Sequence, residues 1–192
     1  MNTFHIRFIV TFLLILFAFS GTIKASLVNV APQATVTASH PNASGSYPQN
    51  LVDGNYSNLG SQIYGQHSGW WEFDLGQEHT IIEARYYGAW HHPNPNVDYR
   101  FSEYKIEAKN NYSDDWSTIV HMMNNESQTN FHSFSPVSAQ YWRMNVIHSN
   151  YVGPYWNEFE LLAGEPVPEP GLLSLLFLSI GTFGFMKRKK TV

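Results

Sequence analysis

The stretch Trp70-Trp71-Glu72-Phe73-Asp74-Leu75-Gly76 decides the fold. Its apolar residues Trp71, Phe73 and Leu75 alternate with two acidic residues, and the run ends at a glycine. Alternation with a period of two, carried by large aromatic residues, is the signal of a β-strand with one buried face. The pattern therefore predicts a half-buried strand in an antiparallel sheet.

The same alternation returns before and after this strand, and segments rich in glycine, asparagine and proline separate the runs. The further strands that the pattern predicts are residues 34–39, 81–87, 104–109, 118–121, 131–134, 141–147 and 158–162. No stretch of residues 27–164 has a convincing helical period. Seven or eight short strands joined by turns predict an all-β domain, either an antiparallel sandwich or a barrel.

The N-terminus has the composition of a secretion signal. Arg7 precedes the uncharged residues 8–21, and Ala25 offers a small residue at a cleavage point. A basic segment, an apolar segment and a small residue in this order predict a signal peptide over residues 1–25, and hence export. An uncleaved membrane anchor is the alternative, although the apolar run is short for a membrane span.

The C-terminus carries a second processing pattern. Pro168, Glu169 and Pro170 precede the uncharged residues 171–186, which are followed by a basic cluster at 187–190. As a helix the uncharged segment would be roughly 24 Å long, slightly less than a ~30 Å hydrocarbon core. Residues 166–192 resemble the PEP-CTERM sorting signal of Gram-negative bacteria. This implies that an exosortase is a partner, that the helix anchors the protein transiently in the inner membrane, and that the mature protein reaches the cell envelope, outer surface or extracellular matrix. A plain membrane anchor is the alternative.

Without its two ends the chain is strongly acidic. Residues 26–165 contain five Lys or Arg and fourteen Asp or Glu, a net charge of −9. Such a domain does not attract phosphate backbones, which argues against nucleic acid as a partner. The chain has no cysteine, so the exported domain must be held by its core, or by a bound ion, in place of disulfides.

The segments that carry the pattern also resemble those of a known family. In chain order they are residues 29–31, 51–55, 71–76 and 104–108, Trp116, Ala139 with 141–143, and 158–162. Together they resemble the discoidin, or F5/8 type C, domain and its bacterial relatives among the family-32 carbohydrate-binding modules. The resemblance implies that residues 26–165 form an eight-stranded antiparallel jelly-roll sandwich of the galactose-binding-domain type. The disulfide that often joins the ends of animal members is absent, which weakens the link to their phospholipid-binding branch.

The first candidate site is a turn rich in oxygen ligands. Gly54 permits a tight backbone, and the surrounding residues with side-chain oxygens are Asn50, Asp53, Asn55 and Asn58. Calcium prefers six to eight oxygen ligands of mixed kinds, and this turn alone offers too few. The family resemblance implies that the Glu158 carboxylate and the Asn157 carbonyl complete a structural Ca²⁺ site. An ordinary Asx turn without an ion is the alternative.

The second candidate site is a group of aromatic and polar residues in predicted loops: Trp90, His91, His92, Asn94, Tyr151 and Tyr155. Aromatic faces with polar groups around them are suited to binding saccharides. The resemblance implies that such a site lies among loops at one end of the sandwich. The alternative, that the rings pack onto the core, is favoured for the neighbouring Trp156. His91 and His92 are adjacent, which makes joint chelation of a transition metal difficult.

Catalysis has little support in the sequence. The acidic pairs Asp114-Asp115 and Glu158 with Glu160 suggest a glycosidase, but the first pair falls in a polar turn and Glu158 is better explained as a cation ligand. The chain has no recognisable nucleophile motif and no phosphate-binding loop. The sequence therefore predicts an exported, non-catalytic module that binds a carbohydrate, an exopolysaccharide or an envelope glycan. A structural matrix or adhesin protein that binds no sugar is the alternative.

Overall fold

Eight strands and two short 3-10 helices make up the part of the chain that the structure, a computed structural model, describes: residues 27–57, 60–88 and 98–164. The strands are β1 (Leu27–Asn29), β2 (Thr35–Ala38), β3 (Ser61–Gln62), β4 (Gly69–Gly88), β5 (Phe101–Lys109), β6 (Ser117–Met122), β7 (Thr129–Ser149) and β8 (Tyr155–Gly164). The 3-10 helices are η1 (Ala31–Gln33) and η2 (Pro48–Val52). The expected all-β fold with eight antiparallel strands is confirmed.

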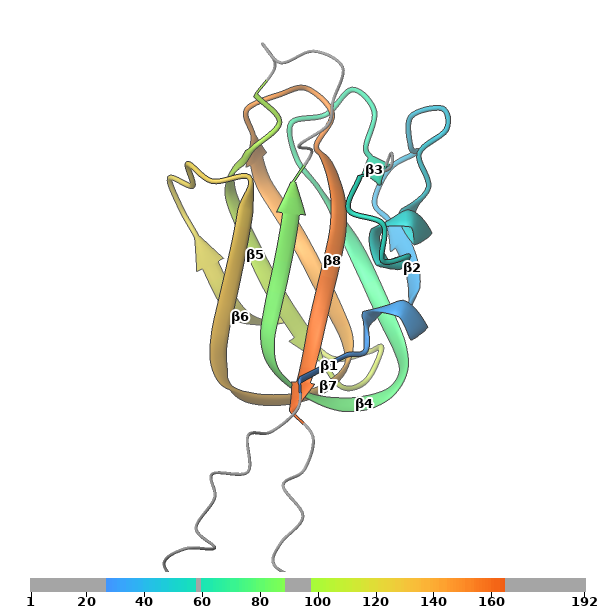
Figure 1. Cartoon of the computed structure of the whole chain (residues 1–192), viewed down its shortest axis with the longest axis vertical. Helices are drawn as coiled ribbons and strands as arrows, with labels where there is room; N and C mark the ends of the chain where they lie inside the picture. The colour runs from blue at the N-terminus through green and yellow to red at the C-terminus, as the bar shows by residue number, and fades with distance from the viewer. Residues whose placement is uncertain (1–26, 58–59, 89–97, 165–192) are drawn as a thin grey trace, which may run out of the picture. The chain divides into compact units, whose positions relative to one another are not determined.

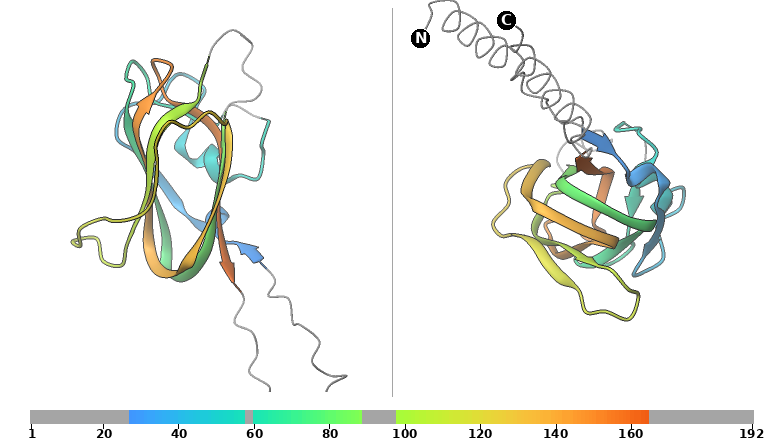
Figure 2. Two further views of the ribbon diagram at one scale, coloured as in Figure 1. Left: turned by 90° about the vertical axis from the view of Figure 1, so that its left-hand side faces the viewer. Right: turned by 90° about the horizontal axis from the view of Figure 1, so that it is seen from below.

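Two long strands pass from one layer of the sandwich to the other, as Figures 1 and 2 show. The first half of β4 pairs with β2 and with the second half of β7. That half of β7 also pairs with β5, and β5 pairs with β6. The second half of β4 pairs with β8 and with the first half of β7, and β8 also pairs with β1. All of these pairs are antiparallel. Neighbouring strands are hydrogen-bonded in the order β1-β8-β4-β7-β5-β6.

The core is built from aromatic rings that alternate along the strands. Trp71, Phe73, Tyr86, Trp156 and Phe159 are fully buried. Their ring centroids lie 4.8 to 6.1 Å apart, mostly edge-on or tilted, which are the favourable arrangements for aromatic pairs. The alternation also predicts which residues of β4, β5 and β7 face inward, and all of them are buried: Trp71, Phe73, Leu75, Tyr104, Ile106, Ala108, Trp142, Met144 and Val146.

The structure differs from the expected strand list mainly at the bends. Residues 70–75 and 81–87 lie in one strand, β4, and residues 131–134 and 141–147 lie in β7. The register of β4 against β7 shifts between Asp74 and His79, where the strand turns into the other layer. Gly76 has φ +75° there, a conformation that glycine adopts at little cost.

The two predicted processing segments, residues 1–25 and 166–192, lie outside the described residues, and both assignments stay predictions. In the described ranges, none of the helices has the length and apolar character that spanning a membrane requires.

Candidate functional site

The oxygen-rich turn follows η2 directly. Asp53 caps the end of this helix, and Gly54 takes φ +77°, which a residue with a side chain rarely adopts. The Asp53 Oδ1 atom accepts a hydrogen bond from the Asn55 amide at 2.8 Å, and the Asn55 Oδ1 atom accepts one from the Ser57 amide at 3.1 Å. Two successive Asx turns therefore hold residues 53–57 in a tight, exposed arc.

The last strand places a buried carboxylate against this arc. Glu158 on β8 is 0% exposed. Its Oε1 atom accepts a hydrogen bond from the Gly54 amide at 3.2 Å, while its Oε2 atom has no hydrogen-bond partner among the described residues. Burial raises the pKa of Glu158 to about 8; the Gly54 amide opposes this shift, and the nearby Asp53 and Glu160 carboxylates add to it. A buried carboxylate without a full set of partners is costly in its charged form.

Asn157 provides a second buried oxygen at the same place. Its side-chain amide donates to the Tyr56 carbonyl at 2.8 Å, which ties the arc to β8. Its Oδ1 atom is buried and has no hydrogen-bond partner in the part of the chain that the structure describes. The sequence suggested the backbone carbonyl of Asn157 as a ligand, whereas the atom that lacks a partner here is the side-chain oxygen.

The remaining members of the predicted cation set are placed unequally. Asn50 lies in η2, half-buried, with its amide bonded to the Tyr47 carbonyl at 3.1 Å. Asn58 lies outside the described residues. The structure brings together Asp53, Asn157 and Glu158, and the two buried oxygens without partners fit a hard cation. Groups of three or more His, Cys, Asp or Glu that could hold a metal do not occur among the described residues, but Ca²⁺ also accepts amide and carbonyl oxygens.

A cluster of three tyrosines lies at the end of the sandwich where β5 and β8 begin. The Tyr151 ring lies 4.8 Å from the Tyr99 ring, which in turn lies 5.8 Å from the Tyr155 ring. Tyr151 is 38% exposed, whereas Tyr99 and Tyr155 are 2% and 5% exposed. Of the two predicted tyrosines, Tyr151 therefore presents a ring to solvent, whereas Tyr155 lies in β8, outside the predicted loop, and is buried against Tyr99.

A charged network adjoins the tyrosines. Arg100 donates from Nε and Nη2 to the two carboxylate oxygens of Asp98, each at 2.7 Å. Asn150 donates from Nδ2 to Asp98 at 2.6 Å and from its backbone amide to the Arg100 carbonyl at 3.0 Å. The Arg100 guanidinium and the Asn150 amide hold the pKa of Asp98 well below its usual range. This network holds planar donors and acceptors rigidly beside an exposed ring.

The sequence alone did not identify Asp98, Tyr99, Arg100 or Asn150 as site residues. The only available signal was their position: Asp98 to Arg100 directly follow a proline-rich loop, and Asn150 directly precedes Tyr151. The predicted ligand residues Trp90, His91, His92 and Asn94 lie outside the described residues and stay predictions. Trp156 is a fully buried core residue, as the alternative interpretation held.

The acidic pairs considered for catalysis have other partners. The Asp114 Oδ2 atom accepts from the backbone and side-chain amides of Asn111, both at 2.9 Å. Glu160 accepts from the Tyr56 and Tyr87 hydroxyls and pairs with Arg85 at 3.4 Å. These contacts explain Asp114 as part of a turn and Glu160 as part of an ion-pair network on the sheet.

Comparisons with solved structures agree with this architecture. A chitosan-binding module from a chitosanase/glucanase of Paenibacillus sp. IK-5, studied as a selenomethionine-labelled mutant, is 20% identical, with a TM-score of 0.61 over 72% of this chain and 100% of that one. The family 32 carbohydrate-binding module of Streptococcus pneumoniae EndoD is 19% identical, with a TM-score of 0.59 over 70% and 98%. The family 32 module of C. perfringens NanJ, solved with galactose, is 13% identical, with a TM-score of 0.60 over 71% and 99%. No curated protein matches the chain.

The strand order and the likeness to these solved structures thus define a β-sandwich domain of the discoidin fold. The family model named F5/8 type C domain matches residues 35–161. The chain belongs to the F5/8 type C domain family.

Proposed function

We propose that this protein is an exported, non-catalytic module that binds a glycan at the end of the sandwich where Tyr151 lies. The observation that carries the proposal is the exposed Tyr151 ring beside the Asp98–Arg100–Asn150 network. A sugar ring offers C–H groups on one face and hydroxyls at its edge. An exposed aromatic ring next to fixed donors and acceptors complements both.

The similarity to sugar-binding modules supports the choice of ligand class. The solved relatives include modules described as binding chitosan or fucose and a module solved with galactose. Because these modules have low sequence identity to this chain, their structural likeness supports the fold directly and the ligand class by analogy. The individual sugar depends on loop side chains that differ between such modules.

A structural calcium ion is part of the same proposal. Asp53, the Asn157 side-chain oxygen and Glu158 would hold the ion, together with other oxygens of the turn. The buried oxygens without partners at Asn157 and Glu158 support this assignment. The ion would neutralise the buried carboxylate and fix residues 53–57 against β8.

A glycan array followed by titration of the purified protein tests the binding site. Replacing Tyr151 with alanine removes the exposed ring, and we expect the affinity for the best glycan to fall between about three- and tenfold. Tyr47→Ala is the matched control, because Tyr47 is 63% exposed and lies outside the tyrosine cluster. Trp90→Ala tests the predicted ligand residues at positions 90–94 in the same assay.

Two results would contradict the proposal. If no glycan on the array binds, the alternative of a matrix or adhesin protein without sugar binding is favoured. If a glycan binds and Tyr151→Ala and Tyr47→Ala reduce its affinity equally, the site lies elsewhere.

A further inference from the structure

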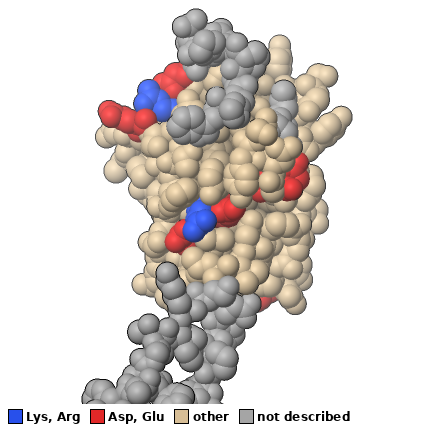
Figure 3. Space-filling view, viewed as in Figure 1, with Lys and Arg blue, Asp and Glu red and all other residues tan. Residues whose placement is uncertain are grey.

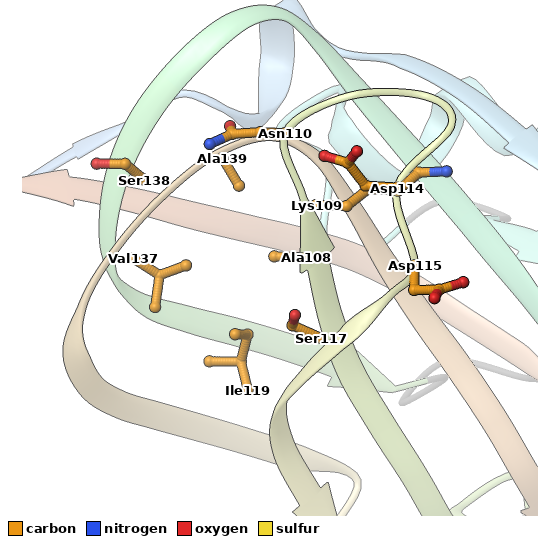
Figure 4. A pocket seen from close by; sticks show the side chains of 10 residues that line it. All are labelled: Ala108, Lys109, Asn110, Asp114, Asp115, Ser117, Ile119, Val137, Ser138 and Ala139. Carbon is orange, nitrogen blue, oxygen red and sulfur yellow. The ribbon is translucent and has the colours of Figure 1, made fainter.

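A pocket of about 310 Å³ lies at the opposite end of the sandwich, between the β5–β6 hairpin and the bend of β7 (Figure 4). Its floor is aliphatic and consists of Ala108, Ile119, Val137 and Ala139. Ser117 and Asp114 are among the polar residues that line it. This volume is at the lower end of the range of small-ligand sites, and an apolar floor with a few polar groups is their usual composition.

The polar groups around the pocket do not all face it. Figure 4 shows the Ser117 hydroxyl between the aliphatic side chains and the Asp114 carboxylate at the upper rim, whereas the Asp115 carboxylate points away. The Asp114 Oδ2 atom accepts two hydrogen bonds from Asn111. In the described part of the chain, its Oδ1 atom accepts none, so one acceptor is available to a ligand at the mouth.

The nearest basic side chain is held away from the mouth. Lys109 donates from Nζ to the Tyr112 carbonyl at 2.6 Å. Its ammonium lies 4.8 Å from the Tyr112 ring centroid and 4.6 Å from that of Trp116, and Figure 4 shows it directed away from the pocket. These cation–π contacts stabilise this position. Among the described residues no basic side chain forms an ion pair with the Asp114 carboxylate, so the mouth favours a positive charge.

We propose that this pocket is a second sugar subsite that takes a protonated amino sugar. The inference rests on the proposed function, carbohydrate binding. The ammonium group of the sugar would donate to the Asp114 carboxylate, its hydroxyls would reach Ser117, and its C–H face would lie on Ile119 and Val137. A sugar without the amine lacks the charged contact, and an N-acetylated sugar carries a bulkier neutral group in its place.

The second subsite is independent of the first, because they lie at opposite ends of the strands. β5 runs from Phe101, paired with Ser149 near the tyrosine cluster, to Lys109, paired with Tyr141 near the pocket. One module could thus hold two glycan segments. Two sites on one module raise its avidity for a polymer without a stronger contact at either site.

The test is a titration of the purified protein with glucosamine, followed by amide chemical shifts. We expect shifts at Ser117, Ile119 and Val137, and weaker ones with glucose or N-acetylglucosamine. Asp114→Asn keeps an acceptor for Asn111 and removes the charge, and it should weaken glucosamine binding about fivefold, as for an exposed charged pair. Asp115→Asn is the control: it removes an equal charge at the adjacent residue and should change the affinity for glucosamine less than twofold.

A second variant covers the case in which Asp114→Asn perturbs the turn. Ser117→Leu fills the pocket from β6 and should abolish the shifts at Ile119 and Val137. The inference is overturned if glucosamine causes no shifts there, if glucose or N-acetylglucosamine binds equally well, or if the two aspartate variants weaken binding equally. Tyr151→Ala should leave these shifts unchanged. If glycan binding proves independent of Tyr151 while the glucosamine shifts persist, the proposed site at Tyr151 is contradicted and the inference about the pocket stands.

Discussion

At the scale of single residues, Glu158 links the fold to the proposed ion. It is fully buried, one of its oxygens has no hydrogen-bond partner within residues 27–57, 60–88 and 98–164, and its pKa is raised to about 8. In the unfolded chain a glutamate titrates near 4.3. Between these two values the folded state binds more protons than the unfolded state, so the stability that Glu158 contributes falls as pH rises.

We therefore expect Glu158 to lower the melting temperature, measured in the presence of a chelator, as pH rises from about 4.5 to about 8. Calcium should oppose this fall, because it stabilises the ionised carboxylate. Glu158→Gln should flatten the dependence in chelator. Melting curves over this pH range, with chelator and with Ca²⁺, check the prediction, and a wild-type dependence equal to that of Glu158→Gln would contradict it.

Asp53 gives a separate test of the ion at fixed pH. A ligand that binds only the folded state at a hundredfold excess over its Kd stabilises it by about 2.7 kcal/mol, which is several degrees in melting temperature. Addition of chelator should lower the melting temperature of the wild type accordingly. Asp53→Ala should lower the melting temperature and abolish the effect of the chelator. Asp115→Ala, at an exposed residue, should leave the effect of the chelator intact. Identical wild-type curves with and without chelator would mean that the turn holds no ion.

At the scale of elements, the turn and the last strand depend on one close approach. A Cβ atom at Gly60 would lie 2.0 Å from the Trp156 carbonyl oxygen and 2.6 Å from the Asn157 Cα. Both are backbone atoms, which cannot move aside cheaply. Only glycine therefore allows the segment that follows the oxygen-rich turn to lie on β8.

Gly60→Ala should destabilise the protein by more than about 2 kcal/mol, because an overpacked contact here displaces backbone. Gly76→Ala is the control. A Cβ atom there meets nothing within 4 Å, so only the strain of its positive φ, about 1 kcal/mol, is expected. Urea unfolding measures both values. Equal losses in the two variants would show that the Gly60 contact relaxes at little cost.

The strands were largely predictable from the sequence, and the site was predictable only in part. Period-two alternation located the inward faces of β4, β5 and β7, because burial on one face constrains every second residue. It could not foresee that β4 and β7 each bend into both layers, since the bend depends on pairing between distant segments. Asp98 and Asn150 are residue types that are common in loops, so their sequence context did not mark them as site residues. Only the fold brings them close to Tyr151.

At the scale of the whole molecule, charge should select among polysaccharides. The domain from residue 26 to residue 165 carries a net charge of −9. Arg85, Arg100 and Arg143 are already paired with carboxylates. On the face shown in Figure 3, each blue patch adjoins red ones. Acidic polymers therefore meet repulsion with no free basic patch in the described residues to offset it.

We expect an acidic polyuronate to bind more weakly than a neutral polysaccharide at low ionic strength. Added salt should narrow the difference, because the Debye length shrinks to about 8 Å at physiological ionic strength. Affinity electrophoresis in gels with each polymer, at two salt concentrations, measures this effect. Preferential binding of the acidic polymer at low salt would contradict it.

The course of β8 determines how the module would carry a mechanical load. β8 begins at Tyr155, a member of the tyrosine cluster, and ends at Gly164, which pairs with Leu27. If a glycan is held at the cluster and the chain is tethered beyond Gly164, tension runs along β8. The hydrogen bonds to β1 and β4 lie across that direction. Hydrogen bonds loaded in shear share the force, so the contacts with the sugar should break before the domain unfolds.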